Sequence, residues 1–254
     1  MTKIAIFIPA YNVGLTIATV LDRIPSSLKK EVAEIFIIDN NSKDNTVITA
    51  LEYKEKNNLH NVKIIRNKEN KGYGGSQKIA YQHAIDQKYD VVVMLHGDAQ
   101  YAPEFIPQLL EPILHGNADL VFGSRLQGDP LKGGMPFWRY LGNKGMTVIE
   151  NFILGTKLSE FHSGYRVYSC KALEKIPFHL CSNDYYFDSQ ILVQFIAAGM
   201  KINEIPIPTY YGKESKSPSV YQTVDYCFRT LLTLFGYIIH KWTPLKKEMY
   251  IFKE

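Results

Sequence analysis

The fold of this chain is decided by residues 91–100, whose sequence is Val-Val-Val-Met-Leu-His-Gly-Asp-Ala-Gln. The apolar half of this stretch predicts a strand buried on both faces, as in the interior of a parallel sheet. The polarity then changes abruptly into His96, Asp98 and Gln100. Ligands of open α/β sheets bind just outside the carboxyl ends of the strands. A carboxylate beside an imidazole and an amide therefore predicts a site for a divalent cation or a phosphate-bearing ligand.

The composition is that of a globular protein with an ordinary core, because 46% of the 254 residues are hydrophobic and 21% are charged. The net charge of +4, from 29 Lys and Arg against 25 Asp and Glu, argues against nucleic acid as a partner and suits an anionic ligand or membrane surface. Three cysteines without metal-ligand spacing indicate structural thiols in a reducing compartment. Residues 3–9 begin a strand directly, and no apolar run approaches the ~20 residues that span a bilayer. We therefore expect no signal peptide, no membrane span and a cytoplasmic location.

Strand and helix patterns alternate along the first half of the chain. Strand-like segments at 3–8, 34–38, 62–65, 91–95 and 120–122 are separated by helical patterns at 16–24, 45–57, 76–87 and 103–114. This alternation predicts right-handed βαβ units and a mostly parallel α/β sheet with helices on both faces. The later pattern is looser, with a Gly- and Pro-rich loop at 126–136, helices at 141–154 and 187–198, and strands at 164–168 and 201–207.

Four polar loops, at 9–12, 39–44, 70–75 and 96–100, follow the first four predicted strands. Because parallel strands end at one edge of a sheet, we expect these loops to gather there. Tyr11 beside Asp39 or Asn40 suits a nucleobase, stacked on its face and hydrogen-bonded at its edge. The glycines of 72–75 precede a helix and suit backbone approach to a phosphate. Each loop alone also fits an ordinary turn or helix cap, so only their joint placement favours a nucleotide site.

These loops resemble, in order, the motifs of family 2 glycosyltransferases with the GT-A fold, most closely the polyprenyl-phosphate sugar synthases of the dolichol-phosphate mannose synthase type. Residues 9–12 match the Pro-x-Tyr-Asn motif, residues 39–46 match Asp-Asp-x-Ser-x-Asp-x-Thr, and residues 96–100 fall on the Asp-x-Asp metal motif. Residues 123–125, 163–168 and 204–207 match later landmarks, so the likeness extends over about residues 3–216. It implies an inverting transferase that uses a nucleotide diphosphate sugar as donor.

The resemblance also implies roles for individual residues. It places the donor nucleotide against Pro9, Tyr11, Asn12, Asp39, Asn40, Lys71, Gly72, His96, Gly97, Lys213 and Lys216. The last two are expected in a loop that closes over the diphosphate. It places a divalent cation, Mg²⁺ or Mn²⁺, on Asp98, Gln100 and His96. The catalytic residues that it implies are Asp98, Arg125, Arg139 and Asp188.

Three positions depart from the family pattern. Val13 stands where Glu is usual, Asn40 replaces the second Asp of the base-binding pair, and His96 replaces the first Asp of the metal motif. Asn40 still offers a donor and an acceptor to a base edge. Since Asp98 is the last Asp of the metal motif, we expect the cation to be retained. An imidazole beside it would suit Mn²⁺ better than Mg²⁺.

Polyprenyl phosphate is the acceptor that the resemblance implies, with Arg125 and Arg139 seating its phosphate and Asn143 where a serine is more usual. Such an acceptor needs no strong base, because its phosphate is already anionic at neutral pH. The alternative is a saccharide hydroxyl in cell-surface polysaccharide or glycolipid assembly, which requires a base, and Asp188 is the candidate. A third interpretation is a non-catalytic nucleotide-binding or scaffold protein in which His96 marks a degenerate site.

The chain is expected to divide into a catalytic domain at 1–218 and an amphipathic helical tail at 219–254. One predicted helical face of the tail carries Val224, Phe228, Leu231, Phe235 and Ile238. Residues 231–239 are too few to span a membrane but are flanked by Lys and Arg, which predicts an interfacial helix on anionic lipid at the cytoplasmic face. The same apolar face would equally suit packing on the catalytic domain or on a second copy in a homodimer.

Overall fold

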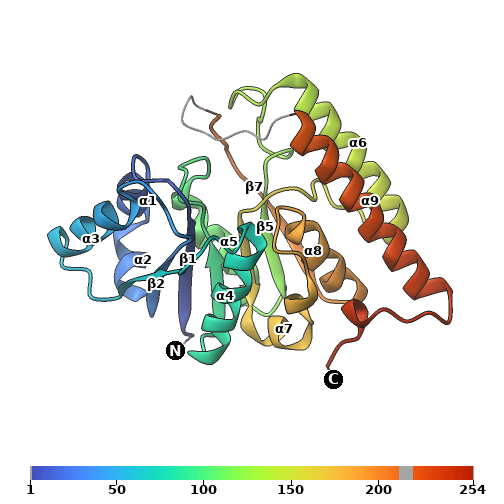
Figure 1. The fold of residues 1–254 in the computed structure, drawn as a ribbon, viewed down its shortest axis with the longest axis horizontal. Coiled ribbons are helices and arrows are strands. Elements are labelled where there is room, and N and C mark those ends of the chain that lie inside the picture. Colours follow the sequence, from blue (N-terminus) through green and yellow to red (C-terminus); the bar gives the residue numbers. More distant parts are fainter. Residues whose placement is uncertain (1, 212–219, 254) are drawn as a thin grey trace.

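The structure is a computed structural model that describes residues 2–211 and 220–253. In this part of the chain one sheet of seven strands, ordered β3-β2-β1-β4-β6-β5-β7, carries helices on both faces (Figure 1). The strands are β1 (Ile4–Ala10), β2 (Glu34–Asp39), β3 (Val62–Arg66), β4 (Val91–Met94), β5 (Leu120–Ser124), β6 (Arg166–Ser169) and β7 (Ile202–Pro206). The predicted α/β architecture with a mostly parallel sheet is confirmed, and it is a GT-A fold.

The strand β6 interrupts the parallel order, because it runs antiparallel to both of its neighbours, β4 and β5. The chain reaches β6 from the carboxyl edge of the sheet, so its first residue, Arg166, is level with Met94 of β4 and Phe122 of β5. The segment just before β6 therefore lies at the same edge as the four polar loops. Strand and helix alternation alone did not predict this reversal.

The helices that follow the strands are close to those predicted. They are α1 (Ile17–Arg23), α2 (Ser26–Glu31), α3 (Thr46–Lys56), α4 (Tyr73–Asp86), α5 (Ile106–Leu114), α6 (Phe137–Leu154), α7 (Cys170–Lys175), α8 (Phe187–Ala197) and α9 (Val220–Trp242). The helix predicted at 141–154 begins one turn earlier because Pro136, with φ of −58°, fits immediately before a first turn. Neither α2 nor α7 was predicted, since six residues are too few for helical periodicity to show.

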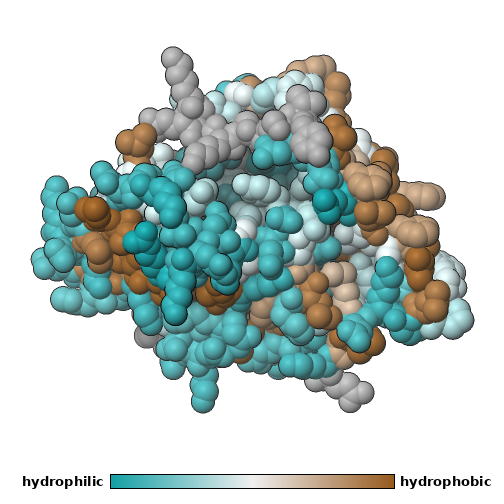
Figure 2. Space-filling model, viewed as in Figure 1, coloured by the Kyte–Doolittle hydropathy of each residue, from teal (hydrophilic) through white to brown (hydrophobic). Residues whose placement is uncertain are grey.

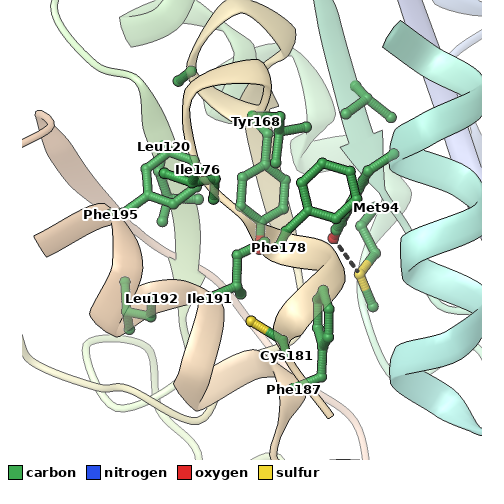
Figure 3. Packing of buried hydrophobic residues seen from close by; sticks show 14 of the residues in the cluster. Met94, Leu120, Tyr168, Ile176, Phe178, Cys181, Phe187, Ile191, Leu192 and Phe195 are labelled. Carbon is green, nitrogen blue, oxygen red and sulfur yellow. Dashed lines mark hydrogen bonds between the residues drawn. The ribbon is translucent and has the colours of Figure 1, made fainter. Parts of the chain in front are cut away.

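Two apolar layers hold the helices against the sheet. Alternate residues of β1 face opposite sides, so that Phe7 enters one layer and Ile6 enters the other. Figure 3 shows the first layer, in which Tyr168 of β6 and Met94 of β4 belong to the same packed cluster as Phe178. Burial of each such side chain stabilises the fold by about 1.5–3 kcal/mol. The apolar run of residues 91–95 is explained by this burial on both faces.

The tail forms the predicted helix, α9, and it lies beside α6 along one side of the molecule (Figure 1). Its predicted apolar face points outward, because Val224, Phe228, Leu231 and Phe235 are exposed. The expectation that this face packs on the catalytic domain is therefore wrong. Among the described residues, no helix is both long enough and apolar enough to cross a bilayer.

Candidate active site

The four polar loops are joined to one another by hydrogen bonds at the carboxyl edge of the sheet. The backbone N–H of Asn12 donates to Ser42 Oγ at 2.9 Å, which joins the first loop to the second. Asn40 Nδ2 donates to Asn70 Oδ1 at 2.7 Å, which joins the second to the third. Thr16, just after the first loop, donates through Oγ1 to the carbonyl of Gly97 at 2.7 Å, which ties down the fourth. The prediction that the loops gather at one edge is confirmed.

Asp44 and Thr46 hold the first loop in an unusual backbone shape. Asp44 Oδ2 accepts from the N–H of Gly14 at 2.9 Å, and Thr46 Oγ1 accepts from that of Val13 at 2.9 Å. Within this frame Asn12 adopts a φ of 52°, a left-handed conformation that Asn tolerates. Burial is the largest single influence on the pKa of Asp44 and raises it. The hydrogen bonds from Thr46 and Gly14 together outweigh burial, so the pKa of Asp44 is lowered. The carboxylate is thus kept charged.

Tyr11 and Asp39, both expected to contact a nucleobase, differ in their exposure to solvent. Tyr11 is exposed at the loop tip, where its ring is accessible to a ligand. Asp39 is fully buried, and its carboxylate lies 3.3 Å from Arg66 Nε and accepts from the N–H of Ser42. The ring of Tyr11 is therefore the accessible member of the pair that was expected to stack on and bond to a base.

Asn40 was expected to present its amide to a base edge, but the structure commits that amide to neighbouring loops. Its Nδ2 donates to Asn70 Oδ1 at 2.7 Å and to the carbonyl of Gly72 at 3.2 Å. Its Oδ1 accepts from the N–H of Lys71 at 2.8 Å and from Asn67 Nδ2 at 3.1 Å. Asn40 thus fastens the second loop to the third.

The glycine-rich loop was expected to bring backbone N–H groups to a phosphate, and in the structure these groups point elsewhere. The N–H groups of Gly74 and Gly75 donate to the carbonyl of Asn183, at 2.7 and 3.2 Å. A Cβ on Gly72, whose φ is +79°, would stand 2.3 Å from the same carbonyl oxygen. Glycine is required here because two backbone segments approach closely.

His96 joins the end of β4 to the first turn of α4 and, through it, to α8. Its Nε2 lies 3.1 Å from the hydroxyl of Tyr73, and that hydroxyl donates to Asp188 Oδ2 at 2.9 Å. Gln77 donates to the other carboxylate oxygen of Asp188, also at 2.9 Å. The ring of His96 packs edge-on against Tyr101, with centroids 5.1 Å apart. Asp188 is buried, and each of its oxygens accepts a hydrogen bond.

This arrangement fixes the proton positions on His96. Burial lowers the pKa of His96, more than Asp98 and Asp188 raise it, so the ring is neutral at pH 7. Tyr73 has one hydroxyl proton, which it gives to Asp188, so His96 must donate through Nε2. The lone pair of the neutral ring is then on Nδ1. His96 was expected among the metal ligands, but its Nε2 is committed to Tyr73.

Two of the expected cation ligands, Asp98 and Gln100, are neighbours after the end of β4. Asp98 Oδ1 accepts from the N–H of Gln100 at 3.1 Å, so the two residues share one turn. Between them Ala99 has a φ of 60°, a conformation that residues other than Gly, Asn and Asp rarely adopt. Within the described ranges, no three His, Cys, Asp or Glu side chains are grouped to hold a metal ion. A single carboxylate still suits a hard cation whose other ligands are substrate phosphates and water.

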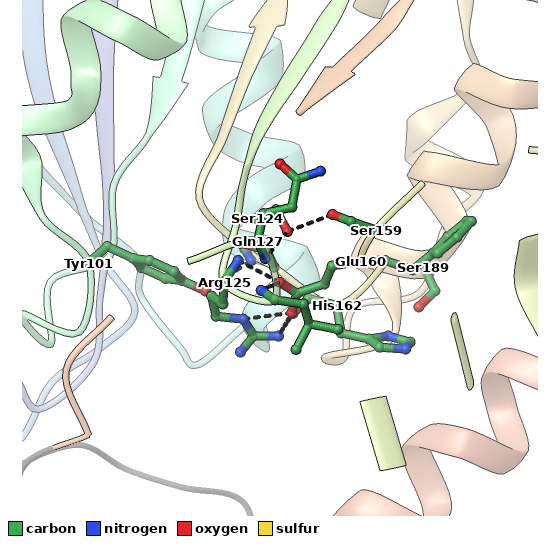
Figure 4. Close-up of polar contacts among 12 residues, drawn as sticks. Tyr101, Ser124, Arg125, Gln127, Ser159, Glu160, His162 and Ser189 are labelled. Carbon is green, nitrogen blue, oxygen red and sulfur yellow. Dashed lines mark hydrogen bonds and ion pairs between the residues drawn. The ribbon is translucent and has the colours of Figure 1, made fainter. Parts of the chain in front are cut away.

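Arg125 is buried in an ion pair with Glu160 (Figure 4). Its Nε donates to Glu160 Oε1 at 2.7 Å, and its backbone N–H donates to Oε2 at the same distance. Further bonds reach the carbonyl of His162 at 2.9 Å and the hydroxyl of Tyr211 at 3.2 Å. Most of the donors on the Arg125 side chain are therefore used within the protein, although this residue was expected to bind the acceptor phosphate.

Arg139 and Asn143 lie one turn apart on α6, beside this ion pair. The guanidinium of Arg139 lies 5.2 Å from the ring centre of Tyr211. Burial lowers the pKa of Arg139, and Arg125 lowers it further, whereas Tyr211 opposes the change. In the described part of the chain, Asn143 Nδ2 is a buried amide nitrogen without a hydrogen-bond partner. A buried donor of this kind next to a cation suits a ligand that brings acceptor oxygens.

Lys213 and Lys216, which were expected to close over the diphosphate, lie outside the described residues. Other site residues were not predicted from the sequence. The missed residues are Tyr73, Gln77, Glu160 and Arg166. Arg166 belongs to the segment 163–168 that matched a family landmark, and Tyr73 belongs to the predicted polar loop at 70–75, whereas Gln77 and Glu160 belong to neither. Arg166 is fully buried and donates to the carbonyl of Asp188 at 2.7 Å.

Two relatives are similar to this chain over most of its length. The chain is 28% identical over 248 residues to the UDP-N-acetylglucosamine–dolichyl-phosphate N-acetylglucosaminyltransferase of Methanococcus voltae, covering 93% of this chain and 98% of that one. It is 27% identical over 218 residues to the undecaprenyl-phosphate mannosyltransferase of Micrococcus luteus, covering 84% of this chain and 85% of that one.

The fold is shared with solved structures. Glucosyl-3-phosphoglycerate synthase of Mycobacterium tuberculosis, crystallised with Mn²⁺, UDP and glucosyl-3-phosphoglycerate, superposes with a TM-score of 0.70 at 19% identity over 92% of this chain and 79% of that one. The family described as glycosyl transferase family 2 matches residues 5–177, which is more than half of the sequence. The chain therefore belongs to glycosyl transferase family 2 and is a glycosyltransferase.

Proposed function

We propose that this glycosyltransferase moves a sugar from a nucleotide diphosphate donor to the phosphate of a polyprenyl phosphate. The observation that carries the proposal is the placement of Arg139 on α6 one turn before Asn143, whose buried Nδ2 has no hydrogen-bond partner. The two donors are next to a helix surface on which Phe137, Trp138 and Leu141 are exposed. A phosphate attached to an apolar chain matches a cation and an amide set in apolar surroundings. The names of the relatives point to the same acceptor class.

The placement of Asp188 supports a phosphate acceptor over a saccharide hydroxyl. Transfer to a hydroxyl needs a base that accepts the proton. Asp188, the candidate, is 7% exposed, and its two oxygens accept from Tyr73 and Gln77. A carboxylate whose two oxygens are both occupied in this way is better suited to orienting Tyr73 and Gln77 than to accepting a proton from an acceptor. A phosphate acceptor needs no such base, because its attacking oxygen is already anionic.

In the proposed reaction an acceptor oxygen attacks the anomeric carbon from the face opposite the leaving nucleoside diphosphate. Arg139 and Asn143 orient the acceptor phosphate, and the exposed ring of Tyr11 contacts the base. Asp98 would hold a Mg²⁺ or Mn²⁺ ion, which would neutralise the charge that develops on the leaving diphosphate. His96, whose Nε2 is bound to Tyr73, lines this end of the sheet without supplying that nitrogen to the ion.

We also infer that the protein binds to an anionic membrane surface through α6 and α9. Both helices bury some polar side chains and expose large apolar ones: on α6, Glu150 is 1% exposed, whereas Phe152 is 88% exposed. Figure 2 shows hydrophobic surface gathered along the side of the molecule where these helices lie. We call this surface the apolar plate. It comprises Phe137, Trp138, Leu141, Val148, Ile149, Phe152, Val224, Phe228, Leu231, Leu232 and Phe235.

Charge favours lipid over a second protein copy as the partner of the apolar plate. Lys144 belongs to α6, Lys241 belongs to α9, and Lys246 and Lys247 follow the end of α9 at Trp242. Arg229 also belongs to α9, where it is paired with Asp225. Basic residues beside exposed apolar ones suit the anionic headgroups of a bilayer, at about 1 kcal/mol each. A second copy would bring the same positive charge to the contact.

The transfer proposal is tested with purified full chain, vesicles that contain undecaprenyl phosphate, and UDP-N-acetylglucosamine, UDP-glucose or GDP-mannose labelled in the sugar. We expect label from one donor to enter the lipid fraction in the presence of Mn²⁺ or Mg²⁺ and not in EDTA. Arg139→Gln should reduce this transfer strongly. Label found only as free sugar or on an added saccharide would contradict the proposed acceptor.

Membrane binding is tested by sedimentation with vesicles of phosphatidylcholine and phosphatidylglycerol. Phe228→Asp/Phe235→Asp should lose most of the binding of the wild-type chain. Ile48→Asp, which alters an exposed apolar residue of α3 outside the apolar plate, should retain it. Equal sedimentation of all three proteins would exclude the membrane role, and a wild-type dimer dissolved by the double substitution would assign the plate to a second copy.

A further inference from the structure

Tyr226 connects α9 to two residues next to the active site. Its hydroxyl lies 3.1 Å from His162 Nδ1 and 2.6 Å from Ser189 Oγ. Its ring packs edge-to-face on the imidazole of His162, with centroids 5.4 Å apart. Thr230, one turn further along α9, donates to the same Ser189 oxygen at 3.4 Å. Polar contacts thus fix the inner face of α9 around Tyr226 and Thr230, while Leu234 and Tyr237 bury its second half in the core.

Each partner of Tyr226 is adjacent to a residue of the site. The carbonyl oxygen of His162 accepts from the guanidinium of Arg125 at 2.9 Å (Figure 4). Ser189 follows Asp188 in the first turn of α8. One hydroxyl therefore ties together the segment that holds Arg125 and the helix that carries Asp188.

The other nitrogen of His162 extends these contacts to α6. His162 Nε2 lies 3.2 Å from Glu150 Oε2, and both side chains are almost fully buried. The imidazole thus lies between Glu150 on α6 and Tyr226 on α9. Tyr226 makes the hydrogen bond to the ring, whereas the contact with Glu150 is a close approach without hydrogen-bond geometry. The two helices of the apolar plate meet at a residue whose backbone binds Arg125.

We propose that Tyr226 is a positioning residue for the transfer reaction. By holding His162 and Ser189, it sets the His162 carbonyl against Arg125 and the start of α8, with Asp188, against the sheet edge. Small displacements of site residues are enough to lower a reaction rate severely. The expected loss of turnover rests on the proposed function, whereas the physical connection between α9 and Arg125 does not depend on it.

The test compares Tyr226→Phe with Tyr250→Phe in the full chain. Tyr250 is a matched control, because its buried hydroxyl also bonds to α9, donating to the carbonyl of Thr233 at 3.2 Å. Hydrogen–deuterium exchange is followed at residues 124–127 and 160–164. We expect exchange there to be about fivefold faster or more in Tyr226→Phe and unchanged in Tyr250→Phe. Equal exchange at these residues in wild type and Tyr226→Phe would overturn the proposal.

The second measurement is the initial rate of sugar transfer to undecaprenyl phosphate in vesicles, with the donor that the wild-type chain uses. We expect Tyr226→Phe to lower kcat about tenfold with little change in the KM for the donor, and Tyr250→Phe to leave both near wild type. The double variant His162→Gln/Tyr226→Phe should have a kcat close to that of either single variant, because both substitutions break the same contact. An unaltered kcat in Tyr226→Phe would overturn the positioning role. If the wild type transfers none of the three sugars, the proposed function fails, and the exchange measurement still decides the connection.

Discussion

The hydroxyl of Tyr73 donates to Asp188 Oδ2 at 2.9 Å, although the two residues are 115 positions apart in the sequence. Tyr73 is in the first turn of α4, and Asp188 is in the first turn of α8. The same hydroxyl contacts His96 at the end of β4, so one phenol joins three elements at the sheet edge. The orientation of Asp188 depends on this bond and on Gln77.

Tyr73→Phe removes the bond and should lower the rate of sugar transfer about tenfold, because Asp188 and His96 lose their common partner. The matched control is Tyr185→Phe, since the Tyr185 ring stacks on Tyr73 at 5.2 Å while the residue itself is exposed. Initial rates in the vesicle assay measure the effect. A Tyr73→Phe rate equal to that of Tyr185→Phe would show that Asp188 is held well enough by Gln77.

The buried ion pair of Arg125 and Glu160 should dominate the stability of this region. Glu160→Gln leaves the guanidinium charged and without its counter-ion, which is expected to lower the free energy of unfolding by about 3–5 kcal/mol. Asp129→Asn breaks the exposed pair with Lys132 and should leave the free energy of unfolding near the wild-type value, because solvent screens this pair. Urea denaturation monitored by fluorescence compares the two. Similar midpoints for both variants would contradict a strong buried pair.

Asp98→Asn should remove the dependence of donor binding on a divalent cation and lower transfer by about 10²-fold or more. The fold should be retained, because the amide oxygen of Asn can accept the same hydrogen bond from the N–H of Gln100 that Asp98 Oδ1 accepts. Thermal shifts with UDP-N-acetylglucosamine, UDP-glucose and GDP-mannose, with and without Mn²⁺, measure the effect. Asp86→Asn, on the surface at the end of α4, is the control. A shift that still grows with Mn²⁺ in Asp98→Asn would place the ion elsewhere.

His96 should make stability depend on pH. Burial lowers its pKa below the ordinary value of 6.5, so the unfolded chain takes up a proton at higher pH than the folded one. The stabilisation is therefore present above pH 6.5 and is lost as the pH falls from 6.5 toward the folded pKa. Over this window the wild-type free energy of unfolding should fall more steeply than that of His96→Asn, by at most about 1.4 kcal/mol per pH unit. Parallel pH profiles from urea denaturation would show that this ring is not protonated on unfolding.

Local patterns in the sequence were enough for the architecture and for the edge at which the site lies. Alternating apolar strands and helices predicted the mostly parallel sheet, because burial on both faces requires continuous apolar strands. The loop motifs predicted a gathering that the bonds from Asn12, Asn40 and Thr16 confirm. The reversed strand β6 was not predicted, since its direction depends on where the chain returns to the sheet.

The contacts of polar side chains were the least predictable feature. Asn40 and Arg125 were expected to face ligands, and both are largely occupied by protein partners. Glu160, the partner of Arg125, is 35 positions away and belongs to no recognised motif. A buried charge or amide must find a partner, and which one it finds depends on distances between segments that sequence spacing does not contain.

Residues 91–100 illustrate both what the sequence determined and what the tertiary structure decided. By itself, the sequence determined that a buried strand ends in a polar turn at the carboxyl edge of a sheet, because the apolar run and its abrupt end are local properties. Only the tertiary structure decided that His96 turns to Tyr73 while Asp98 stays within its own turn. The reason is that α4 places a phenol within hydrogen-bond reach of the His96 imidazole, and burial keeps that ring neutral.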